Sequence, residues 1–377
     1  MEKVKDNIAP RAEGIILFPQ PGKGVVNGKQ IHRTFPVNPT QPITAWGLIG
    51  AGIRAYDYMD GVGNRYGVHT VILEVDGEEV FRSVVDRFAY EENRYINSWT
   101  HGQYMKSFIE PGNRLRMLHA SNGNRGLVEI NEERPYRFVY TLSDALGNTS
   151  KVRFTVQGKN TEIHPVEHRE KYAFKWDRTN YLQEPGLELV VPRGMLYDDV
   201  WLDYSVRADS GDVAFTYQLH NKRVPLHGAC EMRIGLRRDR LEDKSKYYVA
   251  GVTARGGKYS IGGTYEDGFM KVRIRDLGTY TVAVDTVPPE IIPLNPGQWG
   301  RTGRITLKAK DKETGINSYR GTIDGKYALF GKPNSISGNL VCELDPKHVK
   351  KGGRHTVEMT VTDGRGNRTT EEFHFVW

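Results

Sequence analysis

Residues Val357–Val376 read VEMTVTDGRGNRTTEEFHFV, and this stretch decides the fold. Apolar residues occupy every second position on both sides of a polar centre, at Val357, Met359, Val361, Phe373 and Phe375. A period of two places one face of a strand in a core and the other face in water. Between the two runs, Asp363 can cap a turn and Gly366 can adopt the positive φ that the turn needs. The stretch therefore predicts an antiparallel β-hairpin.

The same pattern occurs earlier in the chain and reveals an internal repeat. Residues Phe138–Val156 read FVYTLSDALGNTSKVRFTV, so that Asp144 and Gly147 stand where Asp363 and Gly366 stand in the later copy. An aspartate that caps a turn and a proline that leads into an edge strand open each copy. These openings are Asp6–Pro10 and Asp285–Pro289.

Tight turns inside each copy support the repeat. Asp-Gly pairs lie between apolar runs at Asp76-Gly77 and Asp324-Gly325, and such pairs are strong hairpin signals. The chain also contains 41 glycines and 18 prolines among 377 residues, with few helix-forming stretches. This composition is typical of many short strands joined by turns.

These patterns predict an all-β chain of three tandem immunoglobulin-like or β-sandwich domains. We expect an immunoglobulin-like sandwich at 5–157 with an aromatic-rich insertion at about 86–131, a β-sandwich at 170–285 and an immunoglobulin-like sandwich at 286–377. The middle strands are inferred from alternating apolar residues, the first of them over Val200–Val206. A polar joint at Gln157–Arg169 separates the first two domains.

The insertion in the first domain supplies the candidate binding residues. It is rich in aromatic side chains, and Asn97–Ile109 could form a short helix before Glu110-Pro111-Gly112 ends it. One hypothesis is a flap that closes the open end of the core, since clustered aromatics usually bury one another. The other is a surface that contacts sugar rings or a neighbouring domain. The candidate binding residues are Tyr90, Tyr95, Trp99 and Tyr104.

Composition excludes several classes of protein. The formal net charge is +7, but acidic residues lie among the basic ones, and no recognition helix or RNA-binding signature accompanies them, so no nucleic-acid partner is expected. Weak attraction to anionic envelope polymers is compatible with this charge. No apolar run is long enough to span a membrane, and the first residues are not a signal peptide. Cys230 and Cys342 fall in different predicted domains, so a disulfide is not expected.

No catalytic or metal site can be assembled from the sequence, and no cofactor is predicted in this chain. His164 and His168 have a His-x3-His spacing, but Pro165 argues against a helix that would align the rings. His227 and Cys230 would lie on opposite faces of a strand. Calcium bound by the turn aspartates is a further alternative, although calcium needs six or more oxygens and only isolated carboxylates are visible.

Several segments resemble a known family. VKDNIAPR (4–11), IRAYDYMDG (53–61), MKSFIEPGNRL (105–115), INEERPY (130–136) and GNTS (147–150) are similar to the non-catalytic C-terminal region of envelope-associated lysostaphin/LytM-type zinc metallopeptidases. The resemblance implies a peptidase domain as partner, in cis or in trans, with zinc bound in that absent domain. It also implies an extracytoplasmic place in the periplasm or cell envelope. The family's His-x3-Asp and His-x-His zinc motifs do not occur in this chain, so no catalytic residue is carried over.

Three functions follow as hypotheses. The first is an accessory array of a bacterial peptidoglycan zinc endopeptidase that orients the catalytic domain, binds peptidoglycan or another envelope polymer, or regulates activity. The alternative is a free-standing carbohydrate-binding or adhesive cell-surface protein. The third is a hydrolase with an unrecognised carboxylate site, which we rank last because no residues with mutually supporting roles are visible.

Overall fold

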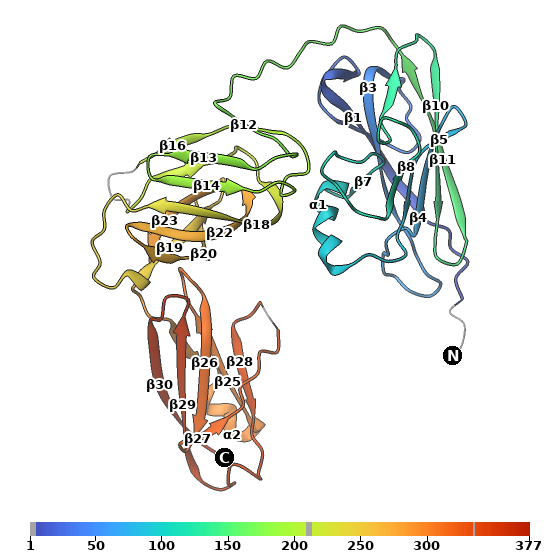
Figure 1. Cartoon of the computed structure of the whole chain (residues 1–377). Helices are drawn as coiled ribbons and strands as arrows, with labels where there is room; N and C mark the ends of the chain where they lie inside the picture. Colours follow the sequence, from blue (N-terminus) through green and yellow to red (C-terminus); the bar gives the residue numbers. More distant parts are fainter. Residues whose placement is uncertain (1–4, 209–212, 335) are drawn as a thin grey trace. The chain divides into compact units, whose positions relative to one another are not determined.

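The computed structural model describes residues 5–208, 213–334 and 336–377, and its regular structure is almost entirely β (Figure 1). The all-β prediction is thereby confirmed. The chain divides into two compact units, one made of the residues up to Thr179 with Arg193–Trp201, the other of Asn180–Pro192 with Leu202–Trp377. The division into three domains stays a prediction. In the described part of the chain, no helix has the length and apolarity to cross a membrane.

The first unit contains a sheet of eleven strands around one core. Its main hydrogen-bonded path runs β2-β1-β3-β11-β10-β4-β5-β8, and only the β3–β11 contact is parallel among the strand pairs described for this sheet. Buried side chains from β1 and from the neighbouring strands β5 and β8, which lie toward opposite ends of that path, join the same apolar cluster. The strands are β1 (Arg11–Val26), β2 (Arg33–Phe35), β3 (Ile43–Tyr56), β4 (Thr70–Val75), β5 (Glu78–Val84), β6 (Thr100–His101), β7 (Tyr104–Lys106), β8 (Leu118–Ala120), β9 (Val128–Ile130), β10 (Pro135–Ser143) and β11 (Thr149–Gly158).

The insertion differs from its predicted form. A 3-10 helix, η1 (Tyr90–Tyr95), leads into α1 (Ile96–Trp99), and the chain then forms the hairpin β6–β7. The prediction of a helix over Asn97–Ile109 is therefore wrong beyond residue 99. Gly102 adopts φ +58°, which turns the chain back on itself, and the Trp99 indole then donates to the Lys106 carbonyl across that hairpin.

The middle region contains two five-stranded sheets. One has the order β13-β14-β18-β22-β21, and the other has the order β16-β17-β23-β19-β20. Their strands are β13 (Asn180–Glu184), β14 (Leu187–Val191), β16 (Ser205–Arg207), β17 (Thr216–Gln218), β18 (Val224–Gly235), β19 (Tyr247–Val252), β20 (Lys258–Gly262), β21 (Thr264–Glu266), β22 (Phe269–Leu277) and β23 (Thr279–Val284), with the 3-10 turn η2 (Lys244–Lys246) before β19.

The strand predicted over Val200–Val206 is interrupted. β15 (Val200–Leu202) pairs with β12 (Tyr172–Phe174), whereas β16 joins a different sheet. Within the first unit, the Lys175 ammonium binds the Asp199 carboxylate at 2.8 Å and the Tyr197 hydroxyl donates to the Arg94 carbonyl. These contacts bind the residues just before Val200 within the first unit, whereas β16 belongs to the second unit, a division that alternation alone does not reveal.

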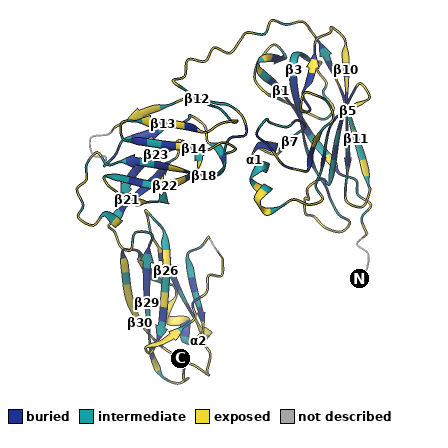
Figure 2. Cartoon of the chain, in the orientation of Figure 1, coloured by how far each residue is buried: buried dark blue, intermediate teal, exposed yellow. Residues whose placement is uncertain are grey.

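The C-terminal sandwich packs a three-stranded sheet, β24-β25-β28, on a four-stranded sheet, β27-β26-β29-β30. Buried apolar residues from both sheets form one cluster. Figure 2 shows buried and partly exposed positions alternating along parts of β25 and β29. The elements are β24 (Glu290–Pro293), η3 (Pro296–Gln298), α2 (Trp299–Thr302), β25 (Arg304–Lys310), β26 (Ile316–Ile323), β27 (Lys326–Ala328), β28 (Asn339–Glu343), β29 (Arg354–Asp363) and β30 (Arg368–Val376).

The predicted turns are confirmed. Both residues of Asp76-Gly77 and of Asp324-Gly325 have positive φ, as a type I′ hairpin requires. The Asp144 carboxylate accepts from the Leu146 and Asn148 amides, and Asp363 accepts from the equivalent amides two and four residues further on.

In both copies of the repeat, the same hydrogen bond joins the closing turn to the opening segment. Asn148 Nδ2 donates to the Asp6 carbonyl, and Asn367 Nδ2 donates to the Asp285 carbonyl, each at 3.0 Å. The closing turn of each copy therefore binds the segment that opens it.

Acid should weaken the C-terminal sandwich through Asp324. Its carboxylate lies 2.7 Å from His355 Nδ1 and accepts the Thr356 amide, and these contacts hold its pKa below the ordinary value of 3.8. A depressed carboxyl pKa contributes stability above the unfolded value, and this contribution is lost as the pH falls through the folded value. We expect the urea midpoint to fall as the pH is lowered from about 5 to about 3, and to fall less in Asp324→Asn. Equal losses in both proteins would contradict this assignment.

Candidate ligand-binding pocket

The four aromatic residues predicted to bind sugar take different positions. Tyr90 is 89% exposed, whereas Trp99 is buried in the core of the first unit. Tyr95 is half-buried, and its ring packs edge-on against Tyr197 at 6.0 Å. Tyr104 is half-buried beneath the Arg54 guanidinium. The structure therefore does not bring the four rings together as one exposed surface, and only Tyr90 presents most of its ring to solvent.

The histidines and cysteines considered from the sequence as metal ligands or disulfide partners take structural or exposed positions. The His168 ring stacks on Trp201 with 3.6 Å between centroids, and His164 is exposed beside Glu162. Cys230 and Cys342 are free and buried. The sequence predicts no disulfide between them. Burial raises the pKa of each thiol to about 11. Neither sulfur is therefore an activated nucleophile.

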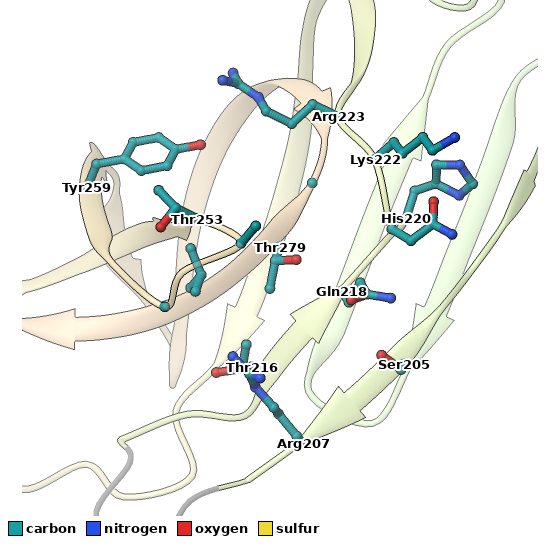
Figure 3. A pocket seen from close by; sticks show the side chains of 15 residues that line it. Ser205, Arg207, Thr216, Gln218, His220, Lys222, Arg223, Thr253, Tyr259 and Thr279 are labelled. Carbon is teal, nitrogen blue, oxygen red and sulfur yellow. The ribbon is translucent and has the colours of Figure 1, made fainter.

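A polar hollow of about 590 Å³ lies on the middle region, where sequence reasoning placed no site. Its floor comes from alternate residues of neighbouring strands, namely Ser205 and Arg207 on β16 and Thr216 and Gln218 on β17, with Thr279 on β23. Loop 220–223 and the β19–β20 hairpin form its walls. Figure 3 shows Tyr259 and Thr253 on one side, and Lys222 and His220 on the other.

An aromatic ring stands at the mouth of this hollow because of one glycine. Gly251 pairs with Tyr259 across the β19–β20 hairpin, and a Cβ at position 251 would meet the Tyr259 ring at 2.2 Å. The missing side chain lets the ring lie directly on the strand. Tyr259 remains 38% exposed, which leaves part of the ring accessible to a ligand.

The charge of the hollow is positive. Within the described residues, no acidic side chain lines it, and neither the Arg207 guanidinium nor the Lys222 ammonium has an ion-pair or hydrogen-bond partner. Arg223 is held at the rim by the Asp276 carboxylate at 2.5 Å. His220 Nδ1 accepts the Asp203 amide at 3.1 Å, which fixes the orientation of that ring.

This set of groups can bind a sugar unit that carries a negative charge. It consists of cations without partners, hydroxyl and amide groups, and one accessible aromatic ring. Among the described residues that line the hollow there is no carboxylate pair of the kind that hydrolyses a glycosidic bond. The arrangement suits binding. Sequence reasoning missed it because its residues come from four separated segments; the nearest local signal is Gly251, a glycine within an otherwise apolar run.

Comparison with protein families gives one match. Residues 171–285 match a Zu5-like domain. The matched residues include both five-stranded sheets and every described residue that lines the hollow. They make up less than half of the chain. The hollow is thus a feature of the Zu5-like region. No curated protein matches the chain.

Solved structures offer remote likenesses. Fibronectin(III)-like modules of Clostridium thermocellum CbhA share 9% identity, with 88% of this chain and 84% of that chain covered and a TM-score of 0.15. A bacterial ice-binding adhesin also shares 9%, with 88% and 90% covered and a TM-score of 0.15. Bacteroides ovatus SGBP-B, solved with a mixed-linkage heptasaccharide, shares 11%, with 93% and 69% covered and a TM-score of 0.15. Likenesses at these TM-scores carry no argument about this chain.

Proposed function

We propose that this chain is a non-catalytic, adhesive β-sandwich protein of the cell surface whose Zu5-like region binds an anionic polysaccharide of the envelope. The observation that carries the proposal is the hollow described above, with Arg207 and Lys222 unpaired on a floor and wall that contain no acid among the described residues. A polymer that repeats a sugar ring beside a carboxylate or phosphate would satisfy both the cations and the Tyr259 ring.

Sedimentation of the full chain with purified peptidoglycan tests this proposal. The double variant Arg207→Ala/Lys222→Ala should bind at least about tenfold more weakly, which corresponds to about 1.4 kcal/mol. Binding of the unaltered chain should also weaken as salt is raised, because exposed charges are screened. The matched control is Lys151→Ala/Arg153→Ala, which removes the same charge from exposed positions on β11 in the first unit.

If the hollow is the binding site, Arg207→Ala/Lys222→Ala must bind peptidoglycan more weakly than Lys151→Ala/Arg153→Ala does. Equal losses would mean that net charge alone attracts the polymer, and this result would overturn the proposal. A neutral glucan in a parallel arm should bind poorly. Salt-independent binding to that glucan would also count against an anionic ligand.

A second test isolates the aromatic ring. Gly251→Ala places a methyl group where the Tyr259 ring lies, so it should displace the ring without removing any polar group of the hollow. We expect it to reduce binding as much as Tyr259→Ala does. Circular dichroism would show whether the variant remains folded, and unchanged binding by both folded variants would exclude a role for the ring.

The biological setting is the narrower part of the proposal. We propose that the chain serves outside the cytoplasm beside a peptidoglycan zinc endopeptidase, and the support is the resemblance of the segments at 4–11, 53–61, 105–115, 130–136 and 147–150 to that family. A bound accessory array raises the effective concentration of a tethered enzyme near its substrate.

The test is to join a lysostaphin-type peptidase domain to Met1 and follow the solubilisation of peptidoglycan. The fusion should act faster than the peptidase domain alone, and Arg207→Ala/Lys222→Ala should remove the advantage. A fusion no faster than the isolated domain would contradict the proposed role beside an endopeptidase. The proposal that the hollow binds polysaccharide would still be decided by the sedimentation test.

A further inference from the structure

The internal repeat brings three carboxylates together in each copy, which the sequence did not reveal. In each cluster, one carboxylate oxygen per residue lies within 4.8 Å of the others. Two oxygens on opposite sides of one calcium ion are about 5 Å apart, so these spacings are compatible with shared coordination. The clusters are Asp6, Asp57 and Asp144 in the first copy and Asp285, Asp311 and Asp363 in the second.

The second cluster is already satisfied by hydrogen bonds within the protein. Asp311 accepts three successive backbone amides, those of residues 313 to 315, at 2.7 to 3.1 Å. Asp285 accepts the Thr314 hydroxyl and the Val287 amide. Asp363 accepts the Arg365 and Asn367 amides together with the Asn367 side chain. These contacts give the second cluster no need of a cation, and we infer no site there.

The first cluster differs at Asp57. This residue is 8% exposed, and its Oδ1 is buried with no hydrogen-bond partner. The loops that follow differ: Asp57 and Tyr66 pair through their backbones and only the adjacent Tyr58 backbone acts on the Asp57 carboxylate, whereas residues 313 to 315 donate three amides to Asp311. A buried carboxylate oxygen without a partner is costly, and its presence therefore points to a ligand.

Nearby cations are engaged elsewhere. Arg65 binds Glu13 at 3.1 Å and lies over the Tyr56 ring, and Arg11 lies over Tyr58. Among the described residues, none of the three carboxylates of the first cluster forms an ion pair. Burial, and after it the charges of Asp144 and Asp6, raise the pKa of Asp57. Asp144 and Asp6 accept hydrogen bonds from the protein, but no described cation balances the negative charge of the cluster, and the Asp57 oxygen has no donor.

We propose that Asp6, Asp57 and Asp144 bind a divalent cation of the hard, oxygen-seeking kind, with calcium as the best fit. Three carboxylates provide up to six oxygens, and calcium accepts six to eight oxygen ligands from carboxylates, carbonyls and water. The bound ion would tie the opening segment of the chain to the end of β3 and to the β10–β11 turn. It would thereby brace the same junction that Asn148 bridges.

Calorimetric titration of CaCl2 into the chelator-treated full chain tests the proposal. We expect one saturable binding event that Asp57→Asn weakens more than tenfold, and an upward shift in Tm with calcium that the same variant abolishes. Asparagine has the size of aspartate and removes the uncompensated charge, so without calcium the variant should melt no earlier than the unaltered protein.

Asp311→Asn is the matched control, because it makes the same change at the equivalent position of the second copy. It should leave the calcium event intact. Three results would overturn the proposal: no calcium-dependent heat or Tm shift, binding that survives Asp57→Asn, or binding that Asp311→Asn abolishes as fully as Asp57→Asn does. The polysaccharide assay is independent of this one, since the hollow shares no residue with the cluster.

Discussion

Replacing Trp299 with alanine should destabilise the C-terminal sandwich by about 3 to 5 kcal/mol, the cost of truncating a buried tryptophan. Trp299 begins α2 and is 2% exposed, and its ring meets Phe373 and Phe375 edge-on at 6.2 Å. Its indole N–H donates to the Leu294 carbonyl at 2.9 Å, so truncation also removes a buried hydrogen bond.

Urea unfolding followed by circular dichroism measures this effect without relying on the removed fluorophore. Leu329→Ala is the control, since Leu329 is an apolar residue of the same sandwich that is 73% exposed. It should change stability by no more than about 0.5 kcal/mol. Comparable losses in the two variants would show that Trp299 does not anchor the core.

Asn367→Ala should cost about 2 to 3 kcal/mol, because it removes a buried amide that donates to a carboxylate. Asn367 is 8% exposed, and its Nδ2 donates to Asp363 Oδ2 at 2.7 Å and to the Asp285 carbonyl at 3.0 Å. Asp363 is completely buried, so water cannot replace the lost donor. The opening and closing segments of the repeat would separate at this point.

The first copy of the repeat provides the comparison for that variant. Asn148 makes the same two contacts with Asp6 and Asp144 but is only half-buried. Asp144 is also buried, at 4% exposed, but the half-buried Asn148 side chain opens to solvent, so water can enter the space that its removal leaves, and Asn148→Ala should cost less, about 1 kcal/mol. The measurement is the urea midpoint of each variant, and a larger loss in Asn148→Ala would contradict the role assigned to burial.

Local signals predicted those parts of the fold that depend on a few consecutive residues. The Asp-Gly pairs at 76–77 and 324–325 specify hairpins because both residues must adopt positive φ, and the structure has both there. The turns at Asp144 and Asp363 are likewise closed by amides two and four residues away. Strand alternation failed over Val200–Val206, where β15 and β16 pair in different sheets.

The candidate sites required distant residues to meet. Whether Trp99 is a ligand surface or core depends on packing against the sheet, and its sequence neighbours do not record this. The hollow combines β16, β17, β23, a loop and the β19–β20 hairpin. The aspartates at 6, 57 and 144 were visible one by one, as turn caps or isolated acids, but their convergence follows from the sheet that joins β3 with β11 and β10.

By itself the sequence determined that this protein is built of β-sandwiches with a repeated opening and closing turn, because alternation and turn chemistry act over a few residues and need no knowledge of the rest of the chain. Only the tertiary structure decided which polar groups meet. The two copies carry the same three aspartates, yet Asp311 is capped by its own loop and Asp57 is not. Solvation and charge around a buried group depend on all the segments that surround it, and those segments are brought together only by folding.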